Sequence, residues 1–157
     1  MTLTNMNFAE HLRAISPALQ SLMAIARQKT ADLLAPGGVA DAKRAHERQR
    51  ALHGLAWMAT TAEAIAQAAQ WGLRLDAQSA LGESETLLLQ VGVGEYLHQL
   101  VGGIPMGQNE IFRPDELGLA DAIESLRANP TVAWFLAHGN TAQARLGLMS
   151  LVRSGDD

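Results

Sequence analysis

Apolar residues recur at intervals of three and four along most of the chain, a spacing that places them on one face of an α-helix. The first long row consists of Leu19, Leu22, Met23, Ala26, Thr30 and Leu33. It ends at Ala35-Pro36-Gly37-Gly38, the clearest helix-breaking sequence in the first half of the chain. The pattern therefore predicts a long helix that ends near residue 35.

A shorter amphipathic segment precedes this helix, with Phe8, Leu12 and Ile15 on one side. Ser16-Pro17 then resembles an N-cap followed by proline at the first helical position, where no amide hydrogen is needed. We therefore expect a separate short N-terminal helix within residues 1–15 and a new helix from Pro17.

The next predicted helix begins at the capping residue Asp41 and extends to Leu75 or Ser79. It carries two apolar rows, which indicates neighbours on more than one side, with Trp57 and Trp71 filling the larger gaps. The first row is Leu52, Leu55, Ala59, Ala62, Ala66, Ala69 and Leu73, and the second is His53, Trp57, Ala64, Ala68, Trp71 and Leu75.

A third long helix is predicted from Ser84 to about Val101, and because it is apolar on most faces we expect it to be the most buried. A strand over residues 87–93 is the alternative, although no second strand is predicted to pair with it. Gly92 and Gly94 would each cost about 1 kcal/mol relative to alanine in a helix interior. We therefore expect another backbone or a ligand close to both.

Three shorter helices are predicted after residue 114, and the connections between elements are mostly short. The first runs from Pro114 to about residue 128, the second from Asn129-Pro130 to Gly139, and the third begins at Asn140 as its cap. The predicted fold class is all-α: an up-and-down helical bundle with three long helices plus shorter C-terminal helices. We expect one domain over residues 1–155 and a frayed tail at 156–157.

Composition and charge narrow the functional classes. The 157 residues are 48% hydrophobic but only 4% aromatic, and they include no cysteine, which excludes disulfides and thiolate metal sites. The net charge of −4 argues against nucleic-acid binding. The basic run Lys43, Arg44, Arg48 and Arg50 is typical of a solvated face, with an anion or partner contact as the alternative. Since no signal or membrane-spanning pattern is present, we expect a cytoplasmic location and no membrane partner.

The spacing of reactive residues does not support catalysis or metal binding. Glu95 and His98 share a helix face at the spacing used in di-metal bundles, but the motif occurs only once. We expect the two side chains to bond to one another or to nearby backbone groups. His53 is interpreted as a half-buried histidine with a hydrogen-bond partner, with a general base as the alternative. Gly92-Val93-Gly94 lacks the third glycine of a phosphate-binding loop.

The segment from Gly102 to Pro114 combines glycines, prolines and apolar residues in an unusual way. One interpretation is a packed crossover that closes one end of the bundle. The functional interpretation is a docking loop in which Met106, Ile111 and Phe112 contact a partner, while Glu110 and Arg113 set its orientation.

Two stretches of the sequence resemble the N-terminal helical extension of some large bacterial acyl-CoA dehydrogenases, of the methylsuccinyl-CoA dehydrogenase type. The first is His53-Gly54-Leu55-Ala56-Trp57-Met58-Ala59-Thr60 followed by Glu63-Ala64. The second is Gly92-x-Gly94-Glu95-Tyr96-Leu97-x-Gln99-Leu100 and Gly102-Gly103-Ile104-Pro105-Met106-x-Gln108-x-Glu110-x-x-Arg113-Pro114.

The resemblance implies a relation to flavoproteins that oxidise an acyl-CoA thioester with FAD as electron acceptor. The catalytic core of that family needs several hundred further residues, so no catalytic or flavin-binding residue is assigned here and no cofactor is expected in this chain. We expect a non-enzymatic accessory domain whose partner is an acyl-CoA dehydrogenase core, acting in assembly or in access to the active site. The alternative is a free-standing helical interaction module that pairs with itself as a homodimer.

Overall fold

The computed structural model describes residues 6–39 and 41–155, and within them the chain is predominantly helical, which confirms the all-α prediction. The predicted tail at 156–157 and the first five residues lie outside the described part. In chain order the elements are α1 (Phe8–Leu34), α2 (Ala42–Glu47), α3 (Gln49–Ala77), α4 (Glu83–Gly102), β1 (Ile104–Gly107), β2 (Glu110–Phe112), the 3₁₀ helix η2 (Pro114–Leu117), α5 (Ala120–Ala128), α6 (Pro130–His138) and α7 (Ala142–Ser154).

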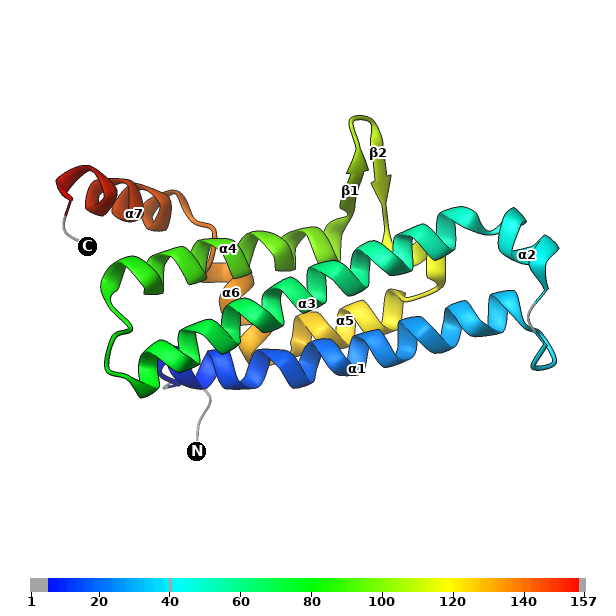
Figure 1. Ribbon diagram of the computed structural model, residues 1–157, viewed down its shortest axis with the longest axis horizontal. Coiled ribbons are helices and arrows are strands. Elements are labelled where there is room, and N and C mark those ends of the chain that lie inside the picture. The colour runs from blue at the N-terminus through cyan, green and yellow to red at the C-terminus, as the bar shows by residue number, and fades with distance from the viewer. Residues whose placement is uncertain (1–5, 40, 156–157) are drawn as a thin grey trace.

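The three long helices α1, α3 and α4 run side by side, as the up-and-down prediction requires (Figure 1). Helix α3 packs against both α1 and α4, while α5 and α6 contact α1, and α6 also contacts α4. One continuous core joins these helices, and its fully buried side chains include Ile15, Ile65, Leu97 and Phe135. The two short C-terminal helices α5 and α6 thus complete the core that the long helices begin.

The predicted break at Ser16-Pro17 is wrong, because α1 continues through Pro17 without interruption. The proline lies on the exposed side of the helix, while the buried row that includes Leu12, Ile15 and Leu19 keeps its phase across it. Proline removes one backbone hydrogen bond from a helix interior. Here the buried row on the opposite side outweighs that loss. The N-cap of α1 is Asn7, whose side chain and Glu10 form a reciprocal capping box.

The second predicted helix is divided in two at Arg48. Asp41 caps α2 as predicted, with its side chain accepting a hydrogen bond from the backbone N–H of Lys43 at 2.9 Å. Helix α3 then begins at Gln49, and its small residues face α1. Trp57 does not fill an internal gap as expected, because 37% of its surface is exposed.

Helix α4 forms where the third long helix was predicted, so the strand alternative for residues 87–93 is excluded. A Cβ at Gly94 would lie 2.6 Å from the backbone nitrogen of Asn140, which confirms the expected close backbone. At Gly92 a Cβ would meet no described atom within 4 Å, so the expected neighbour there is not supplied by the described chain itself. Helix α4 is also less buried than predicted, since Leu88 and Tyr96 are exposed.

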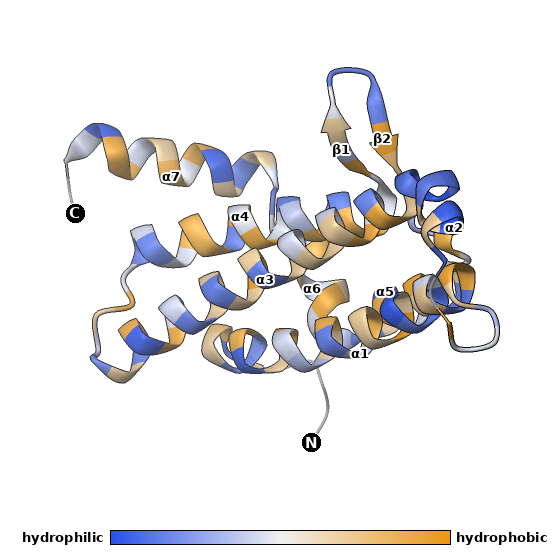
Figure 2. Cartoon of the chain, turned by 45° about the vertical axis from the view of Figure 1, so that its right-hand side comes forward, coloured by the Kyte–Doolittle hydropathy of each residue, from blue (hydrophilic) through white to orange (hydrophobic). Residues whose placement is uncertain are grey.

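The end of the chain differs from the predictions in detail. The helix expected over 114–128 is two elements, η2 and α5, separated by Gly118 with a left-handed φ of 66°. The cap of α7 is Thr141 rather than Asn140. Residues 104–112, expected to be irregular, form an antiparallel hairpin that rises from the bundle on the same side as α7 in Figure 1 and in Figure 2.

Candidate functional site

The hairpin contains four of the five residues that were predicted to dock a partner, and the fifth, Arg113, directly follows it. In the register of the two strands, Ile104 pairs with Phe112 and Pro105 pairs with Ile111. Successive side chains of a strand point to opposite faces. Ile104 and Phe112 are therefore directed inward, where they are at most 2% exposed, whereas Ile111 is 43% exposed.

Phe112 is held in the core by a glycine of α3. A Cβ at Gly54 would overlap the Phe112 ring, so only glycine leaves room for this side chain. Phe112 is among the largest completely buried side chains of the described chain. Phe112 is therefore packed inside the chain, and the described structure presents no part of this side chain at the surface where a partner would dock.

Arg50 of α3 fastens the hairpin to the bundle from outside. Its Nε and Nη2 donate to the Glu116 carboxylate at 2.5 and 3.0 Å, its Nη1 donates to Glu110 at 2.6 Å, and its Nη2 also donates to the carbonyl of Ile111 at 2.8 Å. A two-pronged guanidinium–carboxylate pair fixes geometry as well as charge. The hydrogen bond from Arg50 lowers the pKa of Glu116 and raises the pKa of Arg50 itself. We refer to Arg50, Glu110 and Glu116 as the hairpin clamp.

The clamp changes the interpretation of two residues. Arg50, the last member of the basic run, belongs to an ion-pair network rather than to a fully solvated face. Glu110, predicted to orient a partner, is instead engaged within the chain. Met106 is half-buried against the core, and Arg113 is exposed and donates its backbone N–H to Glu116 at 2.9 Å. A docking role for Met106, Ile111 and Arg113 remains a prediction.

The outward side of α7 is a candidate surface that sequence reasoning missed. Leu146, Met149 and Val152 are 65%, 55% and 69% exposed, and their spacing of three places them in one row. The opposite side of the helix, with buried Ala144, packs against α4. A helix that is apolar on two sides has neighbours on two sides when it is fully packed. The described chain supplies only one, so the outer row of α7 is an unpartnered helix face.

The root of α7 is fixed by a small polar network. Asn140 Nδ2 donates to Glu95 Oε2 at 2.6 Å, and Arg145 Nη1 donates to Asn140 Oδ1 at 2.6 Å. Gln99 donates to the other oxygen of Glu95 at 2.9 Å, and this bond and that from Asn140 lower the pKa of Glu95. The network holds the start of α7 to α4, and an open groove of about 400 Å³ lies beside this contact, lined from both helices by residues that include Gln90, Thr141 and Gly147.

The residues considered for metal or acid–base chemistry have structural partners. His98 Nε2 lies 3.1 Å from the carbonyl oxygen of Leu136, which confirms the expected bond to the backbone. His53 is exposed rather than half-buried, and its Nε2 accepts a hydrogen bond from the Trp57 indole at 2.9 Å. Within the described residues, no three histidine, aspartate or glutamate side chains are grouped so that they could hold a metal ion.

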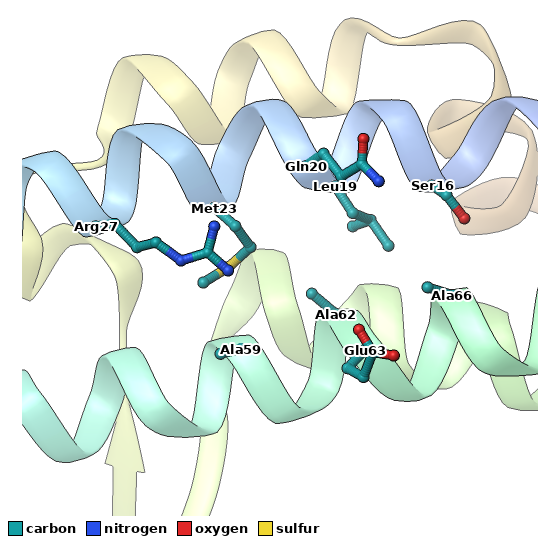
Figure 3. Close-up of a pocket in the computed structure, with 9 residues that line it drawn as sticks. All are labelled: Ser16, Leu19, Gln20, Met23, Arg27, Ala59, Ala62, Glu63 and Ala66. Carbon is teal, nitrogen blue, oxygen red and sulfur yellow. The ribbon is translucent and has the colours of Figure 1, made fainter.

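One groove lies between α1 and α3. Its α3 wall consists of Ala59, Ala62 and Ala66, and the charged side chains of Arg27 and Glu63 extend from the two helices (Figure 3). The cavity volume is about 100 Å³, well below the roughly 300–1,000 Å³ of ordinary small-molecule sites. It reflects the close approach of α1 to an alanine-rich helix. In addition, none of the described helices is both long and apolar enough to cross a bilayer.

Comparison with known proteins shows one sequence similarity. No protein-family model matches the chain. The chain is 36% identical over 137 residues to (2S)-methylsuccinyl-CoA dehydrogenase from Cereibacter sphaeroides, and the match covers 87% of the chain. The chain spans only 24% of the length of that relative. Over most of its length, therefore, this helical chain is similar to about a quarter of an acyl-CoA dehydrogenase, as its sequence motifs indicated.

Proposed function

We propose that the chain is a non-catalytic helical accessory domain that packs against an acyl-CoA dehydrogenase core and acts in assembly or in access to the active site. The observation that carries the proposal is the outer row of α7. Three large apolar side chains in one row, each more than half exposed, are typical of a surface that a partner covers.

The sequence match supports the choice of partner. In the Cereibacter sphaeroides relative, the segment similar to this chain is joined to about three times its own length of further polypeptide. Covalent linkage gives two parts of a chain a high effective concentration, so even a modest apolar face is enough to hold them together. An acyl-CoA dehydrogenase core is therefore the partner that the similarity favours for α7.

Under this proposal, FAD and the acyl-CoA thioester bind to the rest of such an enzyme. The purified chain should then carry no flavin and oxidise no acyl-CoA. A flavin absorption band that persists through desalting would contradict this division of labour.

The test is a graft. The matching segment of the Cereibacter sphaeroides enzyme is replaced by this chain, and acyl-CoA oxidation and subunit assembly are compared with those of the unmodified enzyme and of the enzyme without the segment. We expect the graft to retain activity within about threefold, whereas deletion reduces activity or disrupts assembly. A threefold change corresponds to roughly 0.7 kcal/mol, since about 1.4 kcal/mol is a factor of ten.

Two double substitutions in the grafted enzyme test whether the outer row of α7 carries the effect. Leu146→Glu with Met149→Glu places charge on the outer row, and Ser21→Glu with Ala24→Glu places the same charge on the exposed side of α1. The grafted enzyme that carries the α7 pair should lose at least tenfold in activity or change its assembly state. The grafted enzyme that carries the α1 pair should behave like the graft without substitutions. Equal behaviour of the two pairs would overturn the role of α7.

The alternative function is a helical interaction module that pairs with itself. A different part of the surface, the open side of α4, favours self-association and is considered next.

A further inference from the structure

Helix α4 has an open side that its neighbours leave uncovered. Leu88, Gly92 and Tyr96 are spaced by four residues and share this side, and Leu88 and Tyr96 are 52% and 44% exposed. The buried residues Leu89, Val93 and Leu97 belong to the other side, which faces the core.

Gly92 is the unusual member of this row. Gly94, two residues further on, is explained by the backbone of Gly139 and Asn140, which no side chain at position 94 would permit. At Gly92 no described atom lies within 4 Å of where a Cβ would be. Glycine destabilises a helix interior, and the described chain makes no use of the space that this glycine leaves. The notch at Gly92, between two exposed large side chains, is suited to a backbone from another molecule.

The pattern is symmetric about its centre. Large side chains stand four residues before and four residues after the glycine, so an antiparallel helix crossing at Gly92 would meet the same sequence of large, small and large. We propose that the occupant is a second copy of this chain, with the two α4 helices crossing antiparallel at Gly92. In this two-fold arrangement Leu88 of each copy packs against Tyr96 of the other, as an isologous interface requires.

A second copy that covers α4 together with the adjacent α3 would reach the size of a stable dimer interface. Helix α3 packs beside α4, and its Trp57 is 37% exposed. The 20 residues of α4 span about 30 Å, and two adjacent helices are about 20 Å wide. The resulting footprint is about 600 Å² per copy, or about 1,200 Å² in total, which reaches the lower end of specific, stable interfaces.

Charge is complementary in the antiparallel orientation. Glu83 and Glu85 lie in the first turn of α4. Arg113 lies beyond the other end of the helix, where its Cγ would be 3.6 Å from a Cβ at Gly103. An antiparallel second copy brings this guanidinium toward the acidic end of α4, whereas a parallel copy would place like charges together. The surface consists of α3, α4 and Arg113, so the proposal does not rest on the role proposed for α7.

The experiment is sedimentation equilibrium of the full chain, at concentrations from about 1 to 300 μM. We expect a reversible dimer with a Kd in the micromolar range. Gly92→Gln should weaken the dimer at least tenfold because the side chain fills the crossing point. In dilute solution the same variant should have an unchanged or higher thermal midpoint, since position 92 is open and glutamine is the better helix former. This stability measurement separates lost association from lost folding.

Three further variants complete the test. Ala24→Gln, which adds the same terminal group to the exposed side of α1, should leave the dimer unchanged. Arg113→Glu should weaken it about threefold to tenfold, and this loss should shrink at high salt. Leu146→Glu with Met149→Glu on α7 should leave it intact, because α7 is outside the interface.

Several results would overturn the proposal. A chain that stays monomeric up to 300 μM has no such dimer. A dimer that survives Gly92→Gln but is broken by the α7 pair uses the wrong surface. A monomeric chain in which Gly92→Gln instead abolishes the activity of the grafted dehydrogenase would show that the enzyme core, and not a second copy, occupies this side of α4. If the grafted enzyme is inactive but the isolated chain still forms a dimer that Gly92→Gln weakens, the proposed accessory role is rejected and the proposed dimer stands.

Discussion

The hairpin and α7 leave the bundle on the same side, yet they are attached in opposite ways (Figure 1). The hairpin has unusual, mixed composition, but Phe112 fixes it from inside and the hairpin clamp fixes it from outside. Helix α7 has the ordinary sequence of an amphipathic helix, but it directs Leu146, Met149 and Val152 away from the chain. Unusual composition therefore marks an internally anchored element here, whereas the helix of ordinary composition carries an exposed apolar row.

The largest effect should come from the internal anchor. Phe112→Ala is expected to lower the free energy of unfolding by about 3–5 kcal/mol, as truncation of a buried aromatic does. Met149→Ala on α7 should change it by less than about 0.5 kcal/mol, because the side chain is largely exposed. Urea unfolding, monitored by circular dichroism, measures the free energy of unfolding of both variants. Similar losses would show that the hairpin is anchored no more firmly than α7.

The next effect tests whether Gly54 makes room for Phe112. Gly54→Val should destabilise the chain by about 1–3 kcal/mol through overpacking against the ring. Combining it with Phe112→Leu should cost less than the sum of the two single changes, because the smaller side chain relieves the overlap. The control is Gly92→Ala, where the space is open and stability should rise by about 0.5–1 kcal/mol. Additive losses at Gly54 and Phe112 would show that the two residues do not share one space.

Mild acid should act first where α1 packs against α6. His11 of α1 is 4% exposed, stacks on Trp134 of α6 with ring centroids 4.4 Å apart, and has its pKa lowered by burial from 6.5. The unfolded chain therefore binds the proton more readily, so stability is complete above pH 6.5 and is lost as the pH falls below it. His11→Phe should flatten the thermal midpoint between pH 7 and 5. A midpoint that falls equally in both proteins would exclude His11 as the cause.

Stronger acid should then loosen the hairpin by a smaller amount. The pKa of Glu116 is lowered from 4.5 by its bond to Arg50, so the contribution of this pair is present above pH 4.5 and is lost as the pH falls through the lowered pKa. Both side chains are partly exposed, so the effect is local. We expect amide hydrogens of β2 to lose protection in Arg50→Met at pH 7, with α7 unaffected. Unchanged protection of β2 in Arg50→Met would show that the hairpin clamp does not hold the hairpin to the bundle.

Most helices could be predicted from the sequence because their apolar periodicity is local. The predicted break at Pro17 was nevertheless wrong, because the spacing gives no measure of how strongly the buried row on the opposite side supports a continuous α1. The division between α2 and α3 at Arg48 could not be predicted either, because no helix-breaking residue lies there.

The candidate surfaces depended on pairings that are distant in sequence. Whether Phe112 points inward is decided by the space at Gly54, and Arg50 finds its carboxylates 60 and 66 residues away. The open row of α7 was hidden for another reason. Periodicity shows that a helix has an apolar side, but it does not show how many other elements of the fold pack against that helix. The two-sided pattern of Ala144 and Leu148 against Leu146 and Met149 was the available signal.

The contact between Gly94 and Gly139 has a mechanical consequence. Without side chains between them, the two backbones touch directly, with the Cα of Gly94 2.6 Å from where a Cβ at Gly139 would be. This contact acts as the pivot of a lever, because the 13 residues of α7 extend about 20 Å beyond it. A rotation of about 10° at the pivot would move the far end by about 3 Å. Gly139→Ala would therefore redirect α7 without altering any residue of its outer row, and Val152 would be displaced further than Leu146.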